Sequence, residues 1–95
     1  MAVLSDQEVE EALAVLPGWE RAGDTLVRDL RFADFRQAVA FVLQVAFEAE
    51  SADHHPDLDI RYNRVHVALS THSEGGVTAK DLDLAHAISA LTPEG

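Results

Sequence analysis

The chain lacks cysteine and carries few cations, and both features limit what it can be. None of its 95 residues is cysteine, which excludes disulfides, thiolate zinc sites and cysteine nucleophiles. Only 7 Lys and Arg stand against 17 Asp and Glu, so the formal net charge is −10. Nucleic acids and anionic membranes bind chiefly through Lys and Arg, so we expect neither as a partner. A neutral or weakly polar small molecule fits this charge better.

Long apolar runs are also missing. No stretch approaches the roughly 20 apolar residues that span a bilayer. The first residues are acidic rather than basic and apolar, unlike a secretory signal peptide. We therefore expect a cytoplasmic protein, with residues 1–95 folded as a single domain, since this length supports one core.

Three segments have the apolar spacing of helices. The first spans about residues 5–16, where Ser5 and Glu8 have the spacing of a capping box. The second and longest spans 35–51 after a capping Asp34. The last begins after Thr78 and stops at Thr92-Pro93.

The longest helix is apolar around most of its circumference. We expect its core face to consist of Phe35, Ala38, Val39, Val42, Leu43, Val45, Ala46 and Ala49. Phe41 and Phe47 fall outside that face, on opposite flanks. In so short a chain, this excess of apolar surface indicates a subunit interface.

Two hairpins complete the pattern. The first pairs 19–21 with 25–32, where Leu26, Leu30 and Phe32 share one face and Arg28 interrupts it. The second pairs 60–62 with 65–71 across a turn at Asn63-Arg64. The fold class is thus α+β, in the order α-β-β-α-β-β-α, with a four-stranded antiparallel sheet and three helices in two layers.

Histidines concentrate between these elements. His54 and His55 precede Pro56, which favours extended backbone at His55 and sends the two rings to opposite sides. His72 ends the last predicted strand. Taken singly, each also fits an ordinary exposed residue, as do His66 and His86.

Two carboxylates near the histidines can each be interpreted as a structural residue or as part of a functional site. Asp81 has capping-box spacing from Thr78, and Glu50 fits a solvated position in the last turn of its helix. With Asp53, His54 and His72 they form a possible metal-ligand set, yet there is no His-x-x-x-His pair. Acid–base catalysis by histidine is the alternative that the residues favour, because imidazole titrates near neutral pH.

At these residues the chain resembles the pterin-4a-carbinolamine dehydratases, also called 4a-hydroxytetrahydrobiopterin dehydratases. The family pattern is an acidic residue, three positions, His-His-Pro, an aromatic, a further histidine and a later aspartate. Here the pattern is Glu50, His54-His55-Pro56, Tyr62, His72 and Asp81. The similarity is strongest over residues 35–91. In animal members a tryptophan follows two residues after the proline, whereas this chain has Leu58.

The resemblance implies both a fold and a reaction. It implies four antiparallel strands with three helices on one face, assembled as homodimers or homotetramers. The implied reaction is dehydration of 4a-hydroxytetrahydropterin to quinonoid dihydropterin without a cofactor or metal, recycling the pterin of an aromatic amino acid hydroxylase. Two other functions stay open: a protein-interaction module, like the animal members that help a transcription factor to dimerise, and a metal-dependent hydrolase.

The resemblance also assigns roles to residues. It implies His54 and His72 as the acid–base pair, with His55 holding the pterin. Glu50 and Asp81 would orient the imidazoles. The remaining residues expected to bind or orient the substrate are Asp53, Pro56, Leu58, Ser70 and Thr71.

Overall fold

Each helix begins at a side chain that caps it, as the sequence predicts. In the computed structural model, which describes residues 2–92, Ser5 forms a full capping box with Glu8. The carboxylate of Asp34 accepts the backbone N–H of Gln37 at 2.9 Å, and Thr78 caps the last helix. The elements in chain order are α1 (Asp6–Leu13), β1 (Glu20–Ala22), β2 (Thr25–Arg31), α2 (Phe35–Ala52), β3 (Asp57–Arg61), β4 (Arg64–Leu69), a 3₁₀ turn η1 (His72–Glu74) and α3 (Ala79–Ser89).

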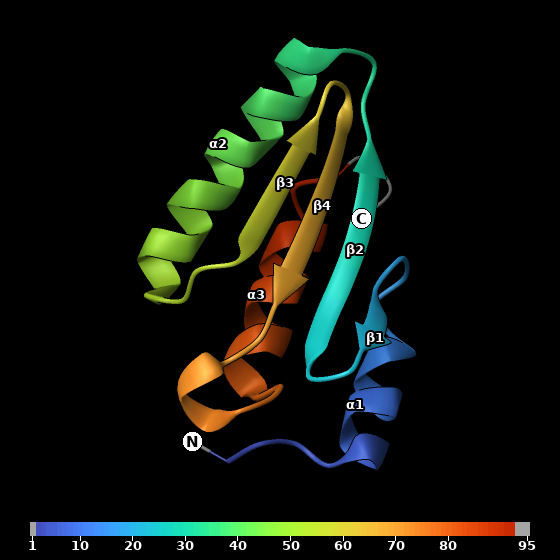
Figure 1. Cartoon of the computed structure of the whole chain (residues 1–95), viewed down its shortest axis with the longest axis vertical. Coiled ribbons are helices and arrows are strands. Elements are labelled where there is room, and N and C mark those ends of the chain that lie inside the picture. Colours follow the sequence, from blue (N-terminus) through green and yellow to red (C-terminus); the bar gives the residue numbers. More distant parts are fainter. Residues whose placement is uncertain (1, 93–95) are drawn as a thin grey trace.

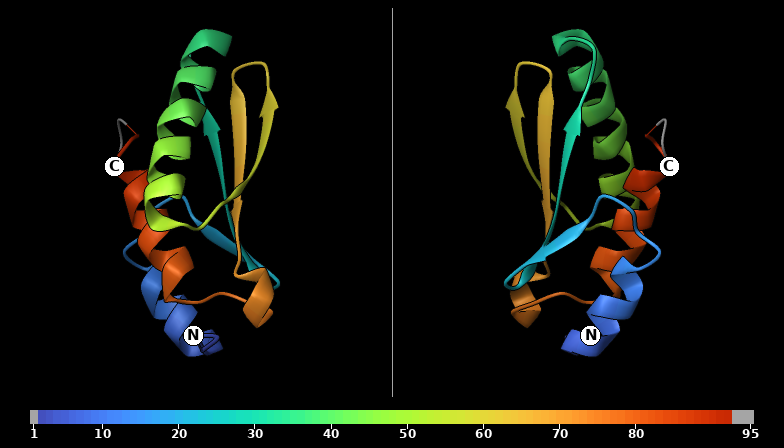
Figure 2. Two further views of the ribbon diagram at one scale, coloured as in Figure 1. Left: turned by 90° about the vertical axis from the view of Figure 1, so that its left-hand side faces the viewer. Right: turned by 90° about the vertical axis from the view of Figure 1, so that its right-hand side faces the viewer.

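The strands form one antiparallel sheet in the order β1-β2-β4-β3. Leu26 lies opposite Leu69 and Leu30 opposite Val65, and these side chains are buried against the helices. Figure 2 shows α1, α2 and α3 on the same side of the sheet. The predicted fold class and element order are therefore confirmed. α3 ends before the predicted stop, and Pro93 lies outside the described residues.

The face that the long helix buries only partly matches the predicted one, since Ala38, Val45 and Ala49 are buried as expected. Its buried residues are Ala38, Phe41, Val45 and Ala49, and the Phe41 ring packs 5.0 Å from that of Phe32. The prediction that Phe41 lies outside the core face was therefore wrong. The apolar residues that remain exposed, by 40–67%, are Phe35, Val39, Leu43 and Phe47. We call this set the α2 stripe; its members are four residues apart, on the side of α2 turned away from the sheet.

The second hairpin is shifted from the predicted position. β3 spans Asp57–Arg61 rather than 60–62, and the turn is Tyr62-Asn63 rather than Asn63-Arg64. The Asn63 side chain donates to the carbonyl of Phe32 at 2.9 Å, which ties the turn to the end of β2. Because pairing continues back to Asp57, the strand starts directly after Pro56 and places Leu58 opposite Val67.

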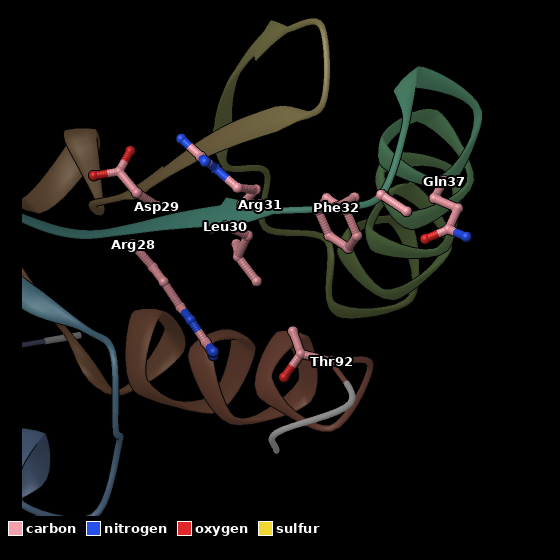
Figure 3. Close-up of a pocket in the computed structure, with 8 residues that line it drawn as sticks. Arg28, Asp29, Leu30, Arg31, Phe32, Gln37 and Thr92 are labelled. Carbon is pink, nitrogen blue, oxygen red and sulfur yellow. The ribbon is translucent and has the colours of Figure 1, made fainter.

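Arg28 points inward despite its charge. Its side chain extends from β2 toward α3 (Figure 3). Arg28 is 8% exposed, and its guanidinium Nη1 donates to Ser89 Oγ at 3.2 Å. Trp19 Nε1 donates to the same oxygen at 2.9 Å, so Trp19 is a core residue. Ser89 ends α3, where the negative end of the helix dipole favours a cation. Arg28 thus keeps the inward register that the sequence left uncertain.

Candidate active site

The end of α2 fixes where the first histidine leaves the helix. Asp53 adopts a left-handed conformation, with φ 51°, which aspartate tolerates better than most residues. The backbone N–H of His54 then donates back to the Ala49 carbonyl at 3.1 Å, as in a Schellman motif. The chain therefore turns sharply at Asp53, and Pro56 leads it directly into β3. Figure 1 shows the end of α2, η1 and the start of α3 near the same end of the sheet.

His54 pairs with a fully buried carboxylate. Its Nε2 lies 2.5 Å from Asp81 Oδ1, with the His54 side chain 11% exposed and that of Asp81 0% exposed. The other oxygen of Asp81, Oδ2, accepts from Thr71 Oγ1 and from the backbone N–H of Thr78, each at 2.9 Å. Asp81 therefore fills both roles that the sequence left open, because it caps α3 and also binds a histidine.

His55 forms a separate and more exposed pair. Its Nε2 lies 2.5 Å from Glu50 Oε2, and the two side chains are 56% and 77% exposed. Water and salt screen such a pair, which is worth about 0–1 kcal/mol at most. The two neighbouring rings thus have separate partners and different exposure, and Glu50 contacts His55 rather than His54.

His72 lies on a turn rather than on a strand. β4 ends at Leu69, so the prediction that the strand continues to residue 71 was wrong. Ser70 is half-buried and Thr71 is 5% exposed, whereas His72 is exposed and begins η1. The strand stops because Thr71 pairs with Gly76 across the turn instead of with β2. His72 consequently reaches solvent one residue after the buried Thr71.

The other predicted site residues lie around these pairs. Asp53 is exposed at the end of α2, while Pro56 and Leu58 are half-buried at the start of β3. Hydrogen bonds connect His54 to Asp81 and Asp81 to Thr71; the His55–Glu50 pair is separate. The sequence interpretation left Thr78 out of the site, although its capping box was the signal that placed it beside Asp81.

The histidines and carboxylates do not gather as a metal-ligand set. Among residues 2–92, no group of three or more His, Asp or Glu side chains is arranged to hold a metal ion. His66, considered structural, pairs with Asp29 at 2.7 Å on the exposed face of the sheet. Within the same described range, no helix has the length and apolar character needed to cross a membrane.

A hollow of about 400 Å³ lies elsewhere, around the end of β2 (Figure 3). Its lining consists of Arg28, Asp29, Leu30, Arg31, Phe32, Ala33, Gln37 and Thr92. None of these is a predicted site residue. We therefore place the candidate active site at the His54–Asp81 pair and not at this hollow, because the hollow is lined by none of the histidines that could exchange protons.

The His54–Asp81 pair has the arrangement of an acid–base group. A buried carboxylate on one ring nitrogen fixes the ring orientation and the tautomer, which leaves the other nitrogen to exchange a proton. It also stabilises the imidazolium that forms when that nitrogen takes up a proton. The exposed His72 lies one residue from Thr71, which itself contacts Asp81.

Comparisons with known proteins agree on one family. Residues 2–91 match the family described as pterin 4 alpha carbinolamine dehydratase. A relative from Thermomicrobium roseum, named "Putative pterin-4-alpha-carbinolamine dehydratase", is 53% identical over 91 residues, covering 96% of this chain and 98% of its own. A relative from Mycobacteroides abscessus with the same name is 53% identical over 88 residues, covering 93% and 94%.

Two solved structures are similar in fold. A crystal structure described as a transcriptional coactivator/pterin dehydratase from Brucella melitensis has a TM-score of 0.90 and 42% identity, covering 94% of this chain and 97% of that one. A pterin dehydratase-like protein described as a RuBisCO assembly factor in the alpha-carboxysome has a TM-score of 0.66 and 19% identity, covering 81% and 89%. The second likeness concerns the fold alone.

Proposed function

Since this chain belongs to the pterin 4 alpha carbinolamine dehydratase family, we propose that it dehydrates 4a-hydroxytetrahydropterin to quinonoid dihydropterin by histidine acid–base catalysis. The observation that carries the proposal is the contact between His54 and the buried Asp81. The proposal treats residues 1–95 as one catalytic domain acting in the cytoplasm, where it recycles the pterin used by an aromatic amino acid hydroxylase.

The reaction needs one proton delivered and one removed. The C4a–O bond breaks as the hydroxyl receives a proton and leaves as water. N5 loses its proton, and the electrons of that N–H bond form the C4a=N5 double bond. The pterin and water together gain no net charge or electrons, so two groups that exchange protons suffice.

We assign the two steps to His54 and His72 by their surroundings. His54 takes the N5 proton, because the carboxylate of Asp81 stabilises the imidazolium that results. His72 donates to the leaving hydroxyl, because its exposed ring can regain a proton from solvent after each turnover. Well-placed groups of this kind each contribute about 10²–10⁴-fold in rate.

The remaining site residues hold the pterin in this proposal. His55 binds it by hydrogen bonding and is oriented by Glu50. Asp53, Pro56, Leu58 and Ser70 are proposed to bind or orient it, whereas Thr71 orients the catalytic side chains through Asp81. Leu58 replaces the tryptophan of animal members, which leaves one wall of the site aliphatic rather than aromatic.

The test is the dehydration rate of 4a-hydroxytetrahydropterin, followed by ultraviolet absorbance. We expect the wild type to accelerate the reaction, and His54→Ala and His72→Ala each to lose at least about tenfold, below the usual range for one acid–base group. His86→Ala is the matched control, because His86 is exposed in the last turn of α3. A wild type no faster than the uncatalysed reaction would overturn the proposal.

The α2 stripe supports assembly into a homodimer or homotetramer. Its spacing of four residues presents a ridge of the kind that packs into a groove on a second helix. Leu43→Lys should shift the mass measured by light scattering to that of a smaller assembly. Gln44→Lys, an exposed neighbour with the same added charge, should leave the mass unchanged. Equal masses for the two variants would argue against this interface.

A non-catalytic interaction module is the second candidate. It is favoured by the α2 stripe and by the description of the Brucella melitensis structure as a transcriptional coactivator as well as a pterin dehydratase. The two functions separate in His72→Ala, which should lose dehydration but keep partner binding. Parallel loss of both would show that they depend on one site.

A further inference from the structure

Thr71 lies between the two proposed catalytic histidines and contacts the surroundings of both. Its hydroxyl touches the carboxylate that holds His54, and its backbone begins the turn that carries His72. We infer that Thr71 is a positioning residue whose hydroxyl holds the carboxylate of Asp81 against His54 and whose backbone places His72. The inference rests on the proposed function for its effect on rate, but not for its effect on the surroundings of the His54 ring.

The direction of the hydrogen bonds follows from the chemistry of the groups. An ionised aspartate only accepts, so Thr71 must use its one hydroxyl hydrogen on Asp81 Oδ2, at 2.9 Å. The 2.8 Å contact between the Thr71 and Thr78 hydroxyls therefore has Thr78 as the donor. The Thr78 oxygen in turn accepts from the backbone N–H of Lys80 at 3.3 Å. The donors thus run in one direction, from α3 through Thr78 and Thr71 to Asp81.

This chain of donors decides how Asp81 meets His54. Oδ2 accepts from Thr71 and from the Thr78 backbone, which leaves Oδ1 for His54 Nε2. Nε2 must then carry the hydrogen, and Nδ1 keeps the lone pair that takes up the substrate proton. Thr71, Thr78 and Asp81 are all at least nine-tenths buried, so solvent has little access to replace a lost partner.

The backbone of Thr71 fixes the second histidine. Its N–H donates to the Gly76 carbonyl at 2.9 Å, and its carbonyl accepts from Glu74 and Gly75 at 2.9 and 3.0 Å. These bonds close the turn η1, whose first residue is His72. One residue therefore sets the position of both rings.

The experiment compares two substitutions of Thr71 with a matched control. Thr71→Val keeps the shape but removes the hydroxyl, and Thr71→Ser keeps the hydroxyl. Thr92→Val is the control, because Thr92 is also buried and its hydroxyl also donates a 2.9 Å bond, but at the opposite end of α3. Long-range ¹H–¹⁵N spectra of the histidine rings report the tautomer and the surroundings of each ring nitrogen, and initial rates report kcat and KM for the pterin.

We expect wild-type His54 to carry its hydrogen on Nε2 with Nδ1 unprotonated. Thr71→Val should keep this tautomer, because the Asp81 carboxylate still only accepts, but should displace the His54 ring signals as the carboxylate loses one of its donors. It should also lower kcat by about tenfold with KM changed by less than about twofold, the signature of a disturbed acid–base arrangement rather than lost binding. Thr71→Ser should restore the wild-type spectrum and most of the rate. Thr92→Val should match the wild type in both.

Three results would overturn the inference. The first is a wild-type His54 that is protonated on Nδ1 and not on Nε2 at neutral pH. The second is a Thr71→Val protein with the spectrum and rate of Thr92→Val. The third is a Thr71→Ser protein with displaced His54 signals and a lowered rate, which also decides the matter if Thr71→Val does not fold. If the wild type lacks dehydratase activity, the proposed function fails, while the spectra still test the positioning.

Discussion

Asp81→Asn is the substitution with the most specific expected outcome. The carboxamide oxygen can replace Oδ2 and keep the bonds from Thr71 and from the Thr78 backbone. Its amide group then faces His54 Nε2, where two donors meet. To avoid that clash His54 must accept at Nε2, which places its hydrogen on Nδ1. The nitrogen proposed to take up the substrate proton would lose its lone pair.

The magnitude follows from three hydrogen bonds. Bonds to a charged group contribute about 1.5–3 kcal/mol and neutral ones about 0.5–1.5, so weakening two and replacing the third costs about 3 kcal/mol. At roughly 4–8 °C per kcal/mol for a domain of this size, the melting temperature should fall by about 12–24 °C. Stability near 0.05–0.15 kcal/mol per residue leaves the variant folded at 25 °C. The dehydration rate should fall by about 10²–10⁴-fold.

The assay combines thermal melting with dehydration rates at 25 °C, and Asp29→Asn is the matched control. Asp29 also pairs with a histidine, His66, at 2.7 Å, but is 82% exposed. Its substitution should cost at most about 1 kcal/mol and no activity. If folded Asp81→Asn and Asp29→Asn dehydrate the substrate equally fast, the argument that Asp81 sets the state of His54 is refuted.

Three further predictions concern other parts of the molecule. Phe41→Ala should lower the free energy of unfolding by about 3–5 kcal/mol in urea titrations, whereas Phe47→Ala in the exposed α2 stripe should cost the isolated protomer far less; equal losses would contradict the observed helix face. Leu58→Trp should lower the KM for the pterin about 2–10-fold, since an aromatic contact is worth about 0.5–1.5 kcal/mol, and an unchanged KM would remove Leu58 from the binding wall. The bond from the Ser5 backbone N–H lowers the pKa of Glu8, so Glu8 stabilises the fold above the ordinary glutamate pKa, and this contribution is lost as pH falls through the lowered value. The melting-temperature gap between wild type and Glu8→Gln should therefore be present at pH 7 and narrow as pH falls through the lowered pKa of Glu8, and a gap that stays constant throughout an acid titration would contradict it.

Local signals made the helix starts predictable from the sequence. A capping box depends on two residues three positions apart, and those at Ser5 and Thr78 form as expected. Asp57, Leu58, Asp59 and Ile60 alternate as a strand does, but the prediction placed this strand at residues 60–62, three residues later than the observed start. The turn then moved with the strand.

Two features depended on the tertiary structure. A helix as apolar as α2 offers several faces of similar hydrophobicity, so periodicity could not select the one that includes Phe41. The contact between His54 and Asp81 joins residues 27 positions apart, which spacing within one element cannot indicate. The family resemblance identified both residues as candidate site residues. Their pairing, and the hydrogen bond from Thr71 to Asp81, could be seen only in the folded structure.

The double use of Asp81 has a consequence for how such sites change in evolution. A carboxylate that caps a helix is retained by selection for folding even when no reaction is under selection. His54 caps no helix, so it can be substituted once the dehydration reaction is no longer under selection. Among proteins of this fold that have acquired a different function, the equivalent of Asp81 should therefore be retained more often than the equivalent of His54. An intact aspartate beside an altered histidine would mark a site that has been inherited but is no longer in use.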